Sequence, residues 1–427
     1  MSRRGSANPE GVAPMNQAIW DLVVGHDEAV GMLKEAVSSE RVTHAWLFTG
    51  PPGIGKLHTA RVFAAALNCP AGGDGTCDTC RRILRGVHPD IHLIFPEGDN
   101  LLVEDVRAVR EEASRTHHEA RTAVFILDEA DRMTEAAANA LLKVLEEPPP
   151  EVVVVLVARS AEALGGTVPS RARALPFVSL SLAELTAALG DDLQLDPDQT
   201  LWAAAASHGR LARARALLTD QAARTRRATV LDLTERLASG QPSDALAAAA
   251  TVVTIADEVA AAARLRQERE VAELEEAFGT GRGTGALRKR LETRHRRELR
   301  RVRFDAIRDS LADLLGAYRD IALLAPDGNA GGLGATRGSG GSGGPGGAVG
   351  SSGEAPLVHP DKAGMFARLA ARIDPATALR AAGAIEEADR RLAIGAAPLL
   401  TLEAAFLSVQ AALRGPAIPI NRLAIRR

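Results

Sequence analysis

The chain has 427 residues, which is too many for one ordinary core and favours two or three domains. Hydrophobic residues make up 46% and charged residues 25%, as in folded globular proteins, and the net charge of −3 excludes a global attraction to nucleic acid. No stretch of about 18 uninterrupted apolar residues predicts a membrane span, and MSRRGSANPEGVAPMNQ lacks the apolar run of a secretory signal. We therefore expect a cytoplasmic protein without a membrane partner.

Four short apolar runs in the first 180 residues predict β-strands. Turn or polar residues bound each run, and helix-like segments separate them, a pattern typical of a parallel sheet covered on both faces. Such α/β sheets bind ligands at the carboxyl ends of their strands. We assign this domain to 19–178, after a tail over 1–18. The predicted strands are 44–48, 90–95, 122–128 and 152–158.

The strand signal disappears after Leu180, and the spacing of Ala, Leu and Arg predicts only helices beyond it. We divide this part into a small helical domain, 179–240, and an all-α domain, 241–427. The Gly-rich stretch 327–356 has nothing to bury and is predicted to be a disordered insert. The predicted helices lie within 182–190, 197–219, 221–238, 242–277, 286–325 and 360–415.

The stretch FTGPPGIGKLHTA contains the pattern G-x-x-x-x-G-K between a predicted strand and a predicted helix. Gly50, Gly53 and Gly55 let backbone amides turn toward phosphate oxygens, and Lys56 adds a positive charge. Leu57, however, stands where Ser or Thr would ligate Mg²⁺. We predict a loop that can bind ATP without hydrolysing it efficiently and that holds Mg²⁺ poorly. A purely structural turn is the alternative.

Asp128 and Glu129 follow the third predicted strand, in AVFILDEADR. A carboxylate at the carboxyl end of such a strand can hold Mg²⁺ through water, and a second can orient an attacking water. Both residues are candidate nucleotide-site residues. The alternative is that they only cap the helix that follows.

The three cysteines, Cys69, Cys77 and Cys80, lie close together, and their odd number does not make a disulfide framework. The spacing Cys77-x-x-Cys80 is typical of a metal knuckle, with the third thiol within loop reach. Three thiolates leave a structural zinc one ligand short. His88 is one candidate for the fourth ligand, and unmetallated thiols are the alternative reading.

The stretch DEADRMTEAAANALLKVLEEPP resembles the signature of bacterial clamp-loader subunits of the AAA+ family. GPPGIGK, the His-Pro-Asp at 88–90 and the Pro-Ser-Arg-Ala at 169–172 fall in the order that this family shows, and the resemblance is dense over 19–180. It implies a RecA-like α/β P-loop domain, a small helical lid and an all-α collar. It also implies a hetero-oligomer with gamma/tau and delta subunits, acting on a sliding clamp and primed DNA.

The resemblance assigns two further sites. Ser170-Arg171-Ala172 matches the family's Ser-Arg-Cys motif, which implies that Arg171 is an arginine finger for the ATP of a neighbouring subunit. Related subunits carry four cysteines in the knuckle region, and registering this chain on them puts Asp74 at the missing one. The implied structural zinc ligands are therefore Cys69, Asp74, Cys77 and Cys80.

Two departures from the family favour a passive member over a motor. The strand that ends in threonines in motor subunits ends here in Arg159-Ser160, and Ala212 occupies the position of a second sensor arginine, with Arg210 and Arg213 as substitutes. An ATP-hydrolysing motor of the gamma/tau kind remains one alternative. A zinc-stabilised DNA-binding protein is the other, because 288–303 is strongly basic; we favour pairing of that segment with the acidic 269–278 in a helical hairpin.

Overall fold

The computed structural model falls into two compact units, one formed by residues 1–188 with 209–211 and the other by 189–208 with 212–427. The prediction of three domains is compatible with this division but is not tested by it. The structure describes residues 17–39, 41–96, 100–114, 119–193, 196–278, 282–326, 357–393 and 395–414. The predicted tail and the predicted disordered insert lie outside these ranges, except for residues 17 and 18.

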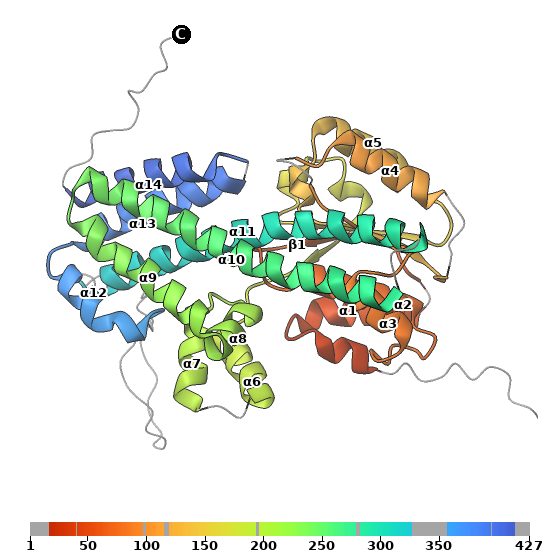
Figure 1. The fold of residues 1–427 in the computed structure, drawn as a ribbon, viewed down its shortest axis with the longest axis horizontal. Helices are drawn as coiled ribbons and strands as arrows, with labels where there is room; N and C mark the ends of the chain where they lie inside the picture. Colours follow the sequence, from red (N-terminus) through yellow and green to blue (C-terminus); the bar gives the residue numbers. More distant parts are fainter. Residues whose placement is uncertain are drawn as a thin grey trace, which may run out of the picture. The chain divides into compact units, whose positions relative to one another are not determined.

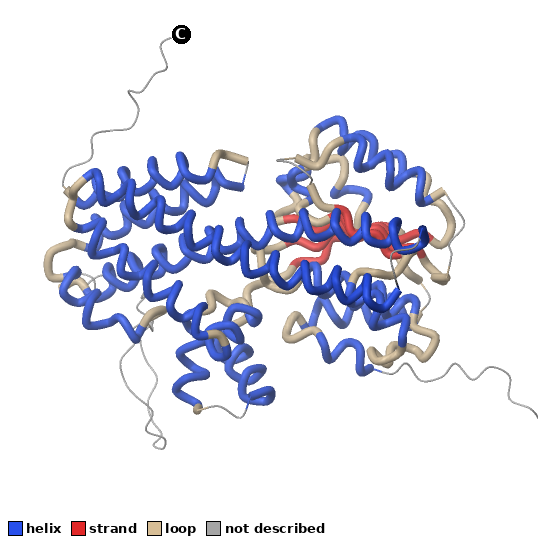
Figure 2. The backbone as a smooth tube through the Cα atoms, in the orientation of Figure 1, coloured by secondary structure: helices blue, strands red, loops and turns tan. Residues whose placement is uncertain are grey.

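The first unit contains a five-stranded parallel sheet in the order β2-β3-β4-β1-β5 (Figures 1 and 2). The four predicted strands are confirmed. The fifth was not predicted, because RALP is short, ends in proline and buries only one of its four residues. The strands are β1 (Ala45–Thr49), β2 (Ile91–Ile94), β3 (Ala123–Leu127), β4 (Val152–Ala158) and β5 (Arg173–Pro176).

Helices cover both faces of this sheet, so strand side chains are buried alternately on one face and the other. Trp46 and Phe48 pack on the face of α1, α2 and α3, whereas Ala45 and Leu47 pack on the face of α4 and α5. The covering helices are α1 (Asp27–Ser38), α2 (Lys56–Asn68), α3 (Asp78–Arg85), α4 (Val103–Ala113) and α5 (Glu135–Glu146). The unit also contains the short 3₁₀ helices η1 (Gln17–Leu22), η2 (Ala130–Arg132), η3 (Glu162–Leu164) and η4 (Pro169–Arg171), and α6 (Leu182–Leu193) begins in it.

The described part of the second unit is helical, as predicted, and buries one large apolar core. The elements are α7 (Pro197–Ala206), α8 (Leu211–Thr219), α9 (Gln221–Ala238), α10 (Pro242–Phe278), α11 (Arg282–Leu324), η5 (Pro360–Lys362), α12 (Ala363–Ala370), α13 (Pro375–Ala393) and α14 (Pro398–Leu413). Residues 242–272 of α10 are long and apolar enough to cross a membrane by composition alone. Ala245, Val252 and Ala256 of this stretch, however, belong to the core that α10 shares with α9, α11, α13 and α14.

The long helices α10 and α11 form the predicted hairpin and lie side by side (Figure 1). Arg303 of α11 forms an ion pair of 2.5 Å with Asp257 of α10. Nearer the turn, Nε2 of His295 lies 2.9 Å from a carboxylate oxygen of Glu270. The helical hairpin is therefore confirmed. Of these two contacts, only that of His295 with Glu270 joins the basic segment to the acidic 269–278, because Asp257 lies outside it.

Candidate nucleotide loop, arginine edge and metal cluster

The G-x-x-x-x-G-K loop connects β1 to α2, and its glycines adopt backbone angles that other residues avoid. Gly50, Gly53 and Gly55 have φ values of 141°, 79° and 104°. A Cβ on Gly50 would also lie only 2.2 Å from the carbonyl oxygen of Phe177. The loop therefore needs glycine at its first position for space as well as for conformation. This geometry brings backbone amides and the amino end of α2 together, as an anion site requires.

Lys56 begins α2 and is buried. Its Nζ donates to the carbonyl oxygens of Gly50 and Pro51, each at 2.5 Å. The ammonium group thus lies over the loop, where it can contact a phosphate oxygen. The predicted loop residues are therefore brought together in the arrangement that a phosphate site requires.

Leu57 is half-buried and packs against the apolar cluster beneath α2. The nearest hydroxyl on this helix is no substitute, because Oγ1 of Thr59 donates to the carbonyl oxygen of Gly55 within the helix. The ring of His58 is also turned away from the loop and contacts the carbonyl oxygen of Leu22. The first turn of α2 therefore has no side chain placed to ligate a magnesium ion at this loop.

Asp128 and Glu129 lie at the carboxyl end of β3, as predicted. Asp128 is buried, and its Oδ1 accepts the backbone N–H of Glu129 at 3.1 Å. Glu129 has a left-handed backbone, φ 50°, and makes no capping hydrogen bond to η2. Its carboxylate instead accepts a 2.7 Å bond from Arg132. The Glu129 side chain therefore does not cap the helix, and its carboxylate is held by Arg132.

Of the two arginines considered as substitute sensors, Arg210 lies at the loop. A Cβ added to Gly53 would come within 2.8 Å of Cδ of Arg210, so the arginine stem runs directly over this glycine. Arg213 is engaged elsewhere, within the helical unit, where its guanidinium lies 2.5 Å from Asp313. Arg210 is therefore the arginine positioned beside the nucleotide loop.

Arg171 lies near the amino ends of the strands, whereas this loop lies at their carboxyl ends. It precedes β5, whose Arg173 is in register with Trp46 near the start of β1, whereas the loop follows Thr49 at the end of β1. The three residue steps from Trp46 to Thr49 already span about 10 Å, which is beyond the reach of one side chain, and Arg171 lies two residues before Arg173, in η4. The Arg171 side chain is 37% exposed and contacts Glu146 of α5 at 2.7 Å. Its guanidinium therefore cannot serve the loop of its own chain.

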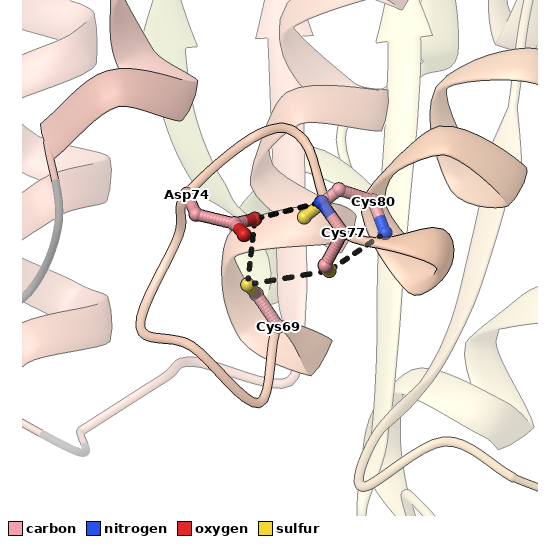
Figure 3. Close-up of side chains that lie close together, drawn as sticks. All are labelled: Cys69, Asp74, Cys77 and Cys80. Carbon is pink, nitrogen blue, oxygen red and sulfur yellow. Dashed lines mark hydrogen bonds between the residues drawn. The ribbon is translucent and has the colours of Figure 1, made fainter.

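The second predicted site is a cluster of three thiols and one carboxylate between α2 and α3 (Figure 3). The candidate ligand atoms of Cys69, Asp74, Cys77 and Cys80 all lie within 4.8 Å of one another. Sγ of Cys69 is 3.8 Å from Sγ of Cys77 and 3.5 Å from Oδ1 of Asp74. Tetrahedral zinc, with Zn–S about 2.3 Å and Zn–O about 2.0 Å, requires separations of about 3.8 and 3.5 Å. The donor set therefore fits zinc.

Backbone hydrogen bonds hold the Asp74 carboxylate in the cluster. Its Oδ1 accepts N–H groups from Cys77 and Thr76, both at 3.1 Å, and these bonds, the one from Cys77 foremost, lower the pKa of Asp74 to about 2. Burial raises the pKa of the Cys80 thiol, and its hydrogen bonds with Cys69 and Cys77 raise it further. A bound cation reverses that preference by stabilising thiolates.

His88 takes no part in the metal cluster, so this alternative for the fourth ligand is wrong. Its Nδ1 accepts the backbone N–H of Asp90 at 3.3 Å, and its carbonyl oxygen accepts the N–H of Ile91. The carboxylate of Asp90 in turn accepts the N–H groups of Glu119 and Ala120 at 2.8 and 2.7 Å. The His-Pro-Asp segment is therefore a structural turn that leads into β2 and holds the residues that precede β3.

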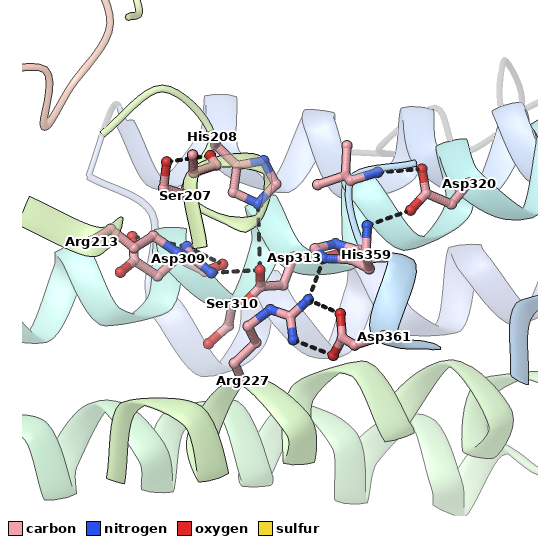
Figure 4. Close-up of polar contacts among 12 residues, drawn as sticks. Ser207, His208, Arg213, Arg227, Asp309, Ser310, Asp313, Asp320, His359 and Asp361 are labelled. Carbon is pink, nitrogen blue, oxygen red and sulfur yellow. Dashed lines mark hydrogen bonds and ion pairs between the residues drawn. The ribbon is translucent and has the colours of Figure 1, made fainter. Parts of the chain in front are cut away.

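The helical unit contains a buried charge network that the sequence analysis did not identify (Figure 4). Arg213 of α8 and His208, which precedes it, both approach the Asp313 carboxylate of α11, at 2.5 and 3.4 Å. Arg227 of α9 donates to Nδ1 of His359 at 2.8 Å and pairs with Asp361. Arginines at buried positions of predicted helices were the only available sign of this network.

Three members of the network could supply metal ligands, namely His208, Asp313 and His359. Both nitrogens of His359 are already committed, because Nδ1 accepts from Arg227 and Nε2 donates to the carbonyl oxygen of Asp313 at 3.0 Å. The Asp313 carboxylate is paired with Arg213. A cation here would face two guanidinium groups, so the donor set does not fit a metal and the network is structural.

Comparison with known proteins matches residues 25–181 to the family model described as DNA polymerase III, delta subunit. A DNA polymerase III subunit delta' of Bacillus subtilis is 40% identical over 35% of this chain and 46% of its own length. The delta' subunit of Pseudomonas aeruginosa is 34% identical over 42% of this chain and 54% of its own length. The gamma/tau subunit of Mycobacterium tuberculosis is 34% identical over 36% of this chain and 28% of its own length. The chain thus spans about half the length of these delta' relatives.

Among solved structures, a gamma subunit-related protein of Thermotoga maritima is similar with a TM-score of 0.35 and 15% identity, over 90% of this chain and 99% of that one. The Holliday junction branch migration motor RuvB of Thermotoga maritima is similar with a TM-score of 0.34 and 18% identity, over 50% of this chain and 64% of that one. At these scores the superpositions carry no argument. The AAA+-like fold rests on the parallel sheet, the loop after β1 and the sequence matches.

Proposed function

We propose that the chain is the delta-prime subunit of a bacterial clamp loader, because residues 25–181 match the family model of the DNA polymerase III delta subunit and are similar to curated delta' subunits. In this role it closes one end of a ring of subunits and supplies Arg171 to the ATP site of a neighbouring motor subunit. The complex opens a sliding clamp and places it on primed DNA for replication in the cytoplasm. The observation that carries the proposal is the position of Arg171, exposed and across the sheet from its own loop.

The state of the chain's own loop supports a member that does not hydrolyse ATP. Leu57 packs into the core where a magnesium-binding hydroxyl would stand, and Glu129 is paired with Arg132. The cradle of glycines and Lys56 remains intact, so we propose that ATP binds without efficient turnover. The gamma/tau-type motor is the less favoured function, because motor chemistry needs the metal ligand that Leu57 has replaced.

The last helix supports a role for the helical unit as a collar that joins subunits. Leu400 and Leu407 of α14 are 67% and 40% exposed, and Glu403 is the only charged residue of this helix. A partly exposed helix with so few charges is typical of a surface that another protein covers. We propose gamma/tau and delta subunits as the partners. We also propose that this chain is a delta-prime subunit of the type found in high-GC actinobacteria, which the Gly-rich stretch 327–356 supports.

We also propose that the knuckle binds one structural Zn²⁺ through Cys69, Asp74, Cys77 and Cys80. The matching sulfur–sulfur and sulfur–oxygen separations support this proposal. The bound ion would tie the loop after α2 to the start of α3, which stabilises the fold locally. No histidine or free carboxylate adjoins the four donors among the residues of this loop that the structure describes, which favours a structural over a catalytic ion.

The proposed function is tested in a reconstituted loader with Arg171→Ala and, as a matched control, Arg107→Ala on the exposed surface of α4. The arginine finger predicts that ATP turnover at the neighbouring site falls about 10³-fold or more in Arg171→Ala, so that the complex loses that site's share of its primed-DNA-stimulated turnover, whereas Arg107→Ala leaves turnover unchanged. Unchanged turnover in Arg171→Ala, with the complex still assembled, would contradict the proposal. The isolated chain should show no appreciable turnover.

A further inference from the structure

The geometry points to Glu146 as a positioning residue that presents Arg171 to the neighbouring subunit. This inference rests on the proposed trans role of Arg171. Glu146 is the last residue of α5, and its Oε1 lies 2.7 Å from a terminal nitrogen of the Arg171 guanidinium. Glu146 lies within the stretch DEADRMTEAAANALLKVLEEPP, which by itself assigns this residue no role. It would hold the guanidinium at the edge of the sheet before the partner's phosphate arrives.

Local packing fixes both ends of this contact. His44, just before β1, places its Nε2 2.9 Å from the carbonyl oxygen of Leu145, so the end of α5 is anchored at the amino edge of the sheet. On the other side, the other terminal nitrogen of Arg171 donates to the carbonyl oxygen of Thr167 at 3.0 Å. The guanidinium is therefore held between the end of α5 and the turn at Thr167, both near the amino ends of the strands.

The ion pair between Glu146 and Arg171 is weak enough to position the arginine and then release it. The Arg171 and Glu146 side chains are 37% and 49% exposed, and exposed ion pairs are weak because water and salt screen them. Such a pair restricts the many rotamers of an arginine yet yields readily to a phosphate, which carries more charge. Glu146 therefore orders the finger in the free subunit without competing strongly for it in the assembled ring.

The residue beside it provides a matched control. Glu147 is equally acidic and exposed, and follows α5 as its C-cap. Replacing Glu147 by Ala removes the same charge from almost the same place but leaves the Arg171 contact intact. A general change in surface potential would affect both variants alike, whereas loss of positioning would affect only Glu146→Ala.

The experiment measures ATP turnover of the reconstituted loader with Glu146→Ala, Glu147→Ala, Arg171→Ala and the double variant Glu146→Ala/Arg171→Ala. We expect Glu146→Ala to lower the maximal turnover about two- to five-fold, the size of an exposed pair, without changing half-saturation by ATP. Glu147→Ala should match the wild type. In the Arg171→Ala background, Glu146→Ala should have no further effect, because it acts only through the arginine.

The outcomes separate the two proposals. If Arg171→Ala lowers turnover but Glu146→Ala behaves like Glu147→Ala, the positioning role fails and the finger stands. An increase in turnover for Glu146→Ala, or an equal loss in both arginine backgrounds, also overturns the positioning role. If Arg171→Ala has no effect, the proposed function itself fails. Glu146→Asp, one methylene shorter, should recover part of the lost turnover.

Discussion

The buried imidazole of His359 predicts that the helical unit loses stability in mild acid. The ring is fully buried beside Arg227, and this burial, reinforced by Arg227 and His208, lowers the pKa of His359 to about 4. The network requires the neutral ring, because its Nδ1 accepts a hydrogen bond from Arg227. Protonation would place a cation beside that guanidinium. The matching perturbation is His359→Gln, whose amide can accept and donate the same two bonds without titrating.

The size of the effect follows from the displacement of the pKa. The ordinary value is 6.5 and the folded value about 4, so between these limits the unfolded chain binds a proton that the folded chain excludes. Folding stability therefore rises with pH across this window, is complete above pH 6.5 and is lost as the pH falls toward about 4. At about 1.4 kcal/mol for each pH unit, His359 accounts for about 3 kcal/mol.

Amide hydrogen exchange on α9 and α11 of the full chain measures this difference, because it reports the free energy of opening the helical unit alone. Between pH 7 and 4.5, which covers most of this window, the wild type should lose about 2.4 kcal/mol more than His359→Gln. Asp313 and Asp361 also titrate in acid, but they are common to both chains and largely cancel in the difference. Parallel pH dependence in the two chains would refute the reasoning.

Three further predictions concern the loop, the knuckle and the last helix. Leu57→Thr should restore a magnesium ligand but leave ATP turnover of the isolated chain well below that of a motor subunit, because Glu129 remains paired; brisk turnover by radiometric assay would argue against this. Asp74→Ala should weaken zinc binding at least tenfold in competition with a chelator, and Asp74→Cys should strengthen it; retention of the metal by the alanine variant would exclude the carboxylate ligand. Leu400→Lys should weaken assembly with other loader subunits in gel filtration while leaving the melting temperature of the isolated chain within about 2 °C, whereas Leu379→Lys, at an exposed position of α13, should change neither; equal effects would show that α14 is not an interface.

The sequence predicted four of the five strands, because the inner strands β1, β3 and β4 are apolar runs, as a parallel sheet buried on both faces requires, and the edge strand β2 is largely apolar too. It missed the other edge strand, β5, because RALP begins with arginine and ends with proline, so pairing with β1 rather than local propensity makes it a strand. The segment predicted as helical over 197–219 is two helices, α7 and α8. The break comes at His208, whose left-handed backbone, φ 54°, precedes Gly209.

Site residues that are close together in sequence could be predicted, whereas partners that are distant in sequence could not. The loop glycines and Lys56 could be found because their chemistry is contiguous in sequence. Asp74 could be proposed only from the register with related subunits. The pairing of Arg213 with Asp313, and of Arg171 with Glu146, joins residues that are far apart in sequence or on different elements. Spacing within one element says nothing about such partners, and three-dimensional packing alone selects them.

The two ends of the parallel sheet carry different functional groups. Strand direction puts the loop residues at the carboxyl ends of the strands and Arg171 near their amino ends. If Arg171 acts in trans as proposed, neighbouring subunits must all face the same way around the assembly, so that the arginine of one meets the loop of the next. A subunit that supplies the arginine but hydrolyses no ATP itself needs such a neighbour on one side only, and on this proposal it stands at the end of the row.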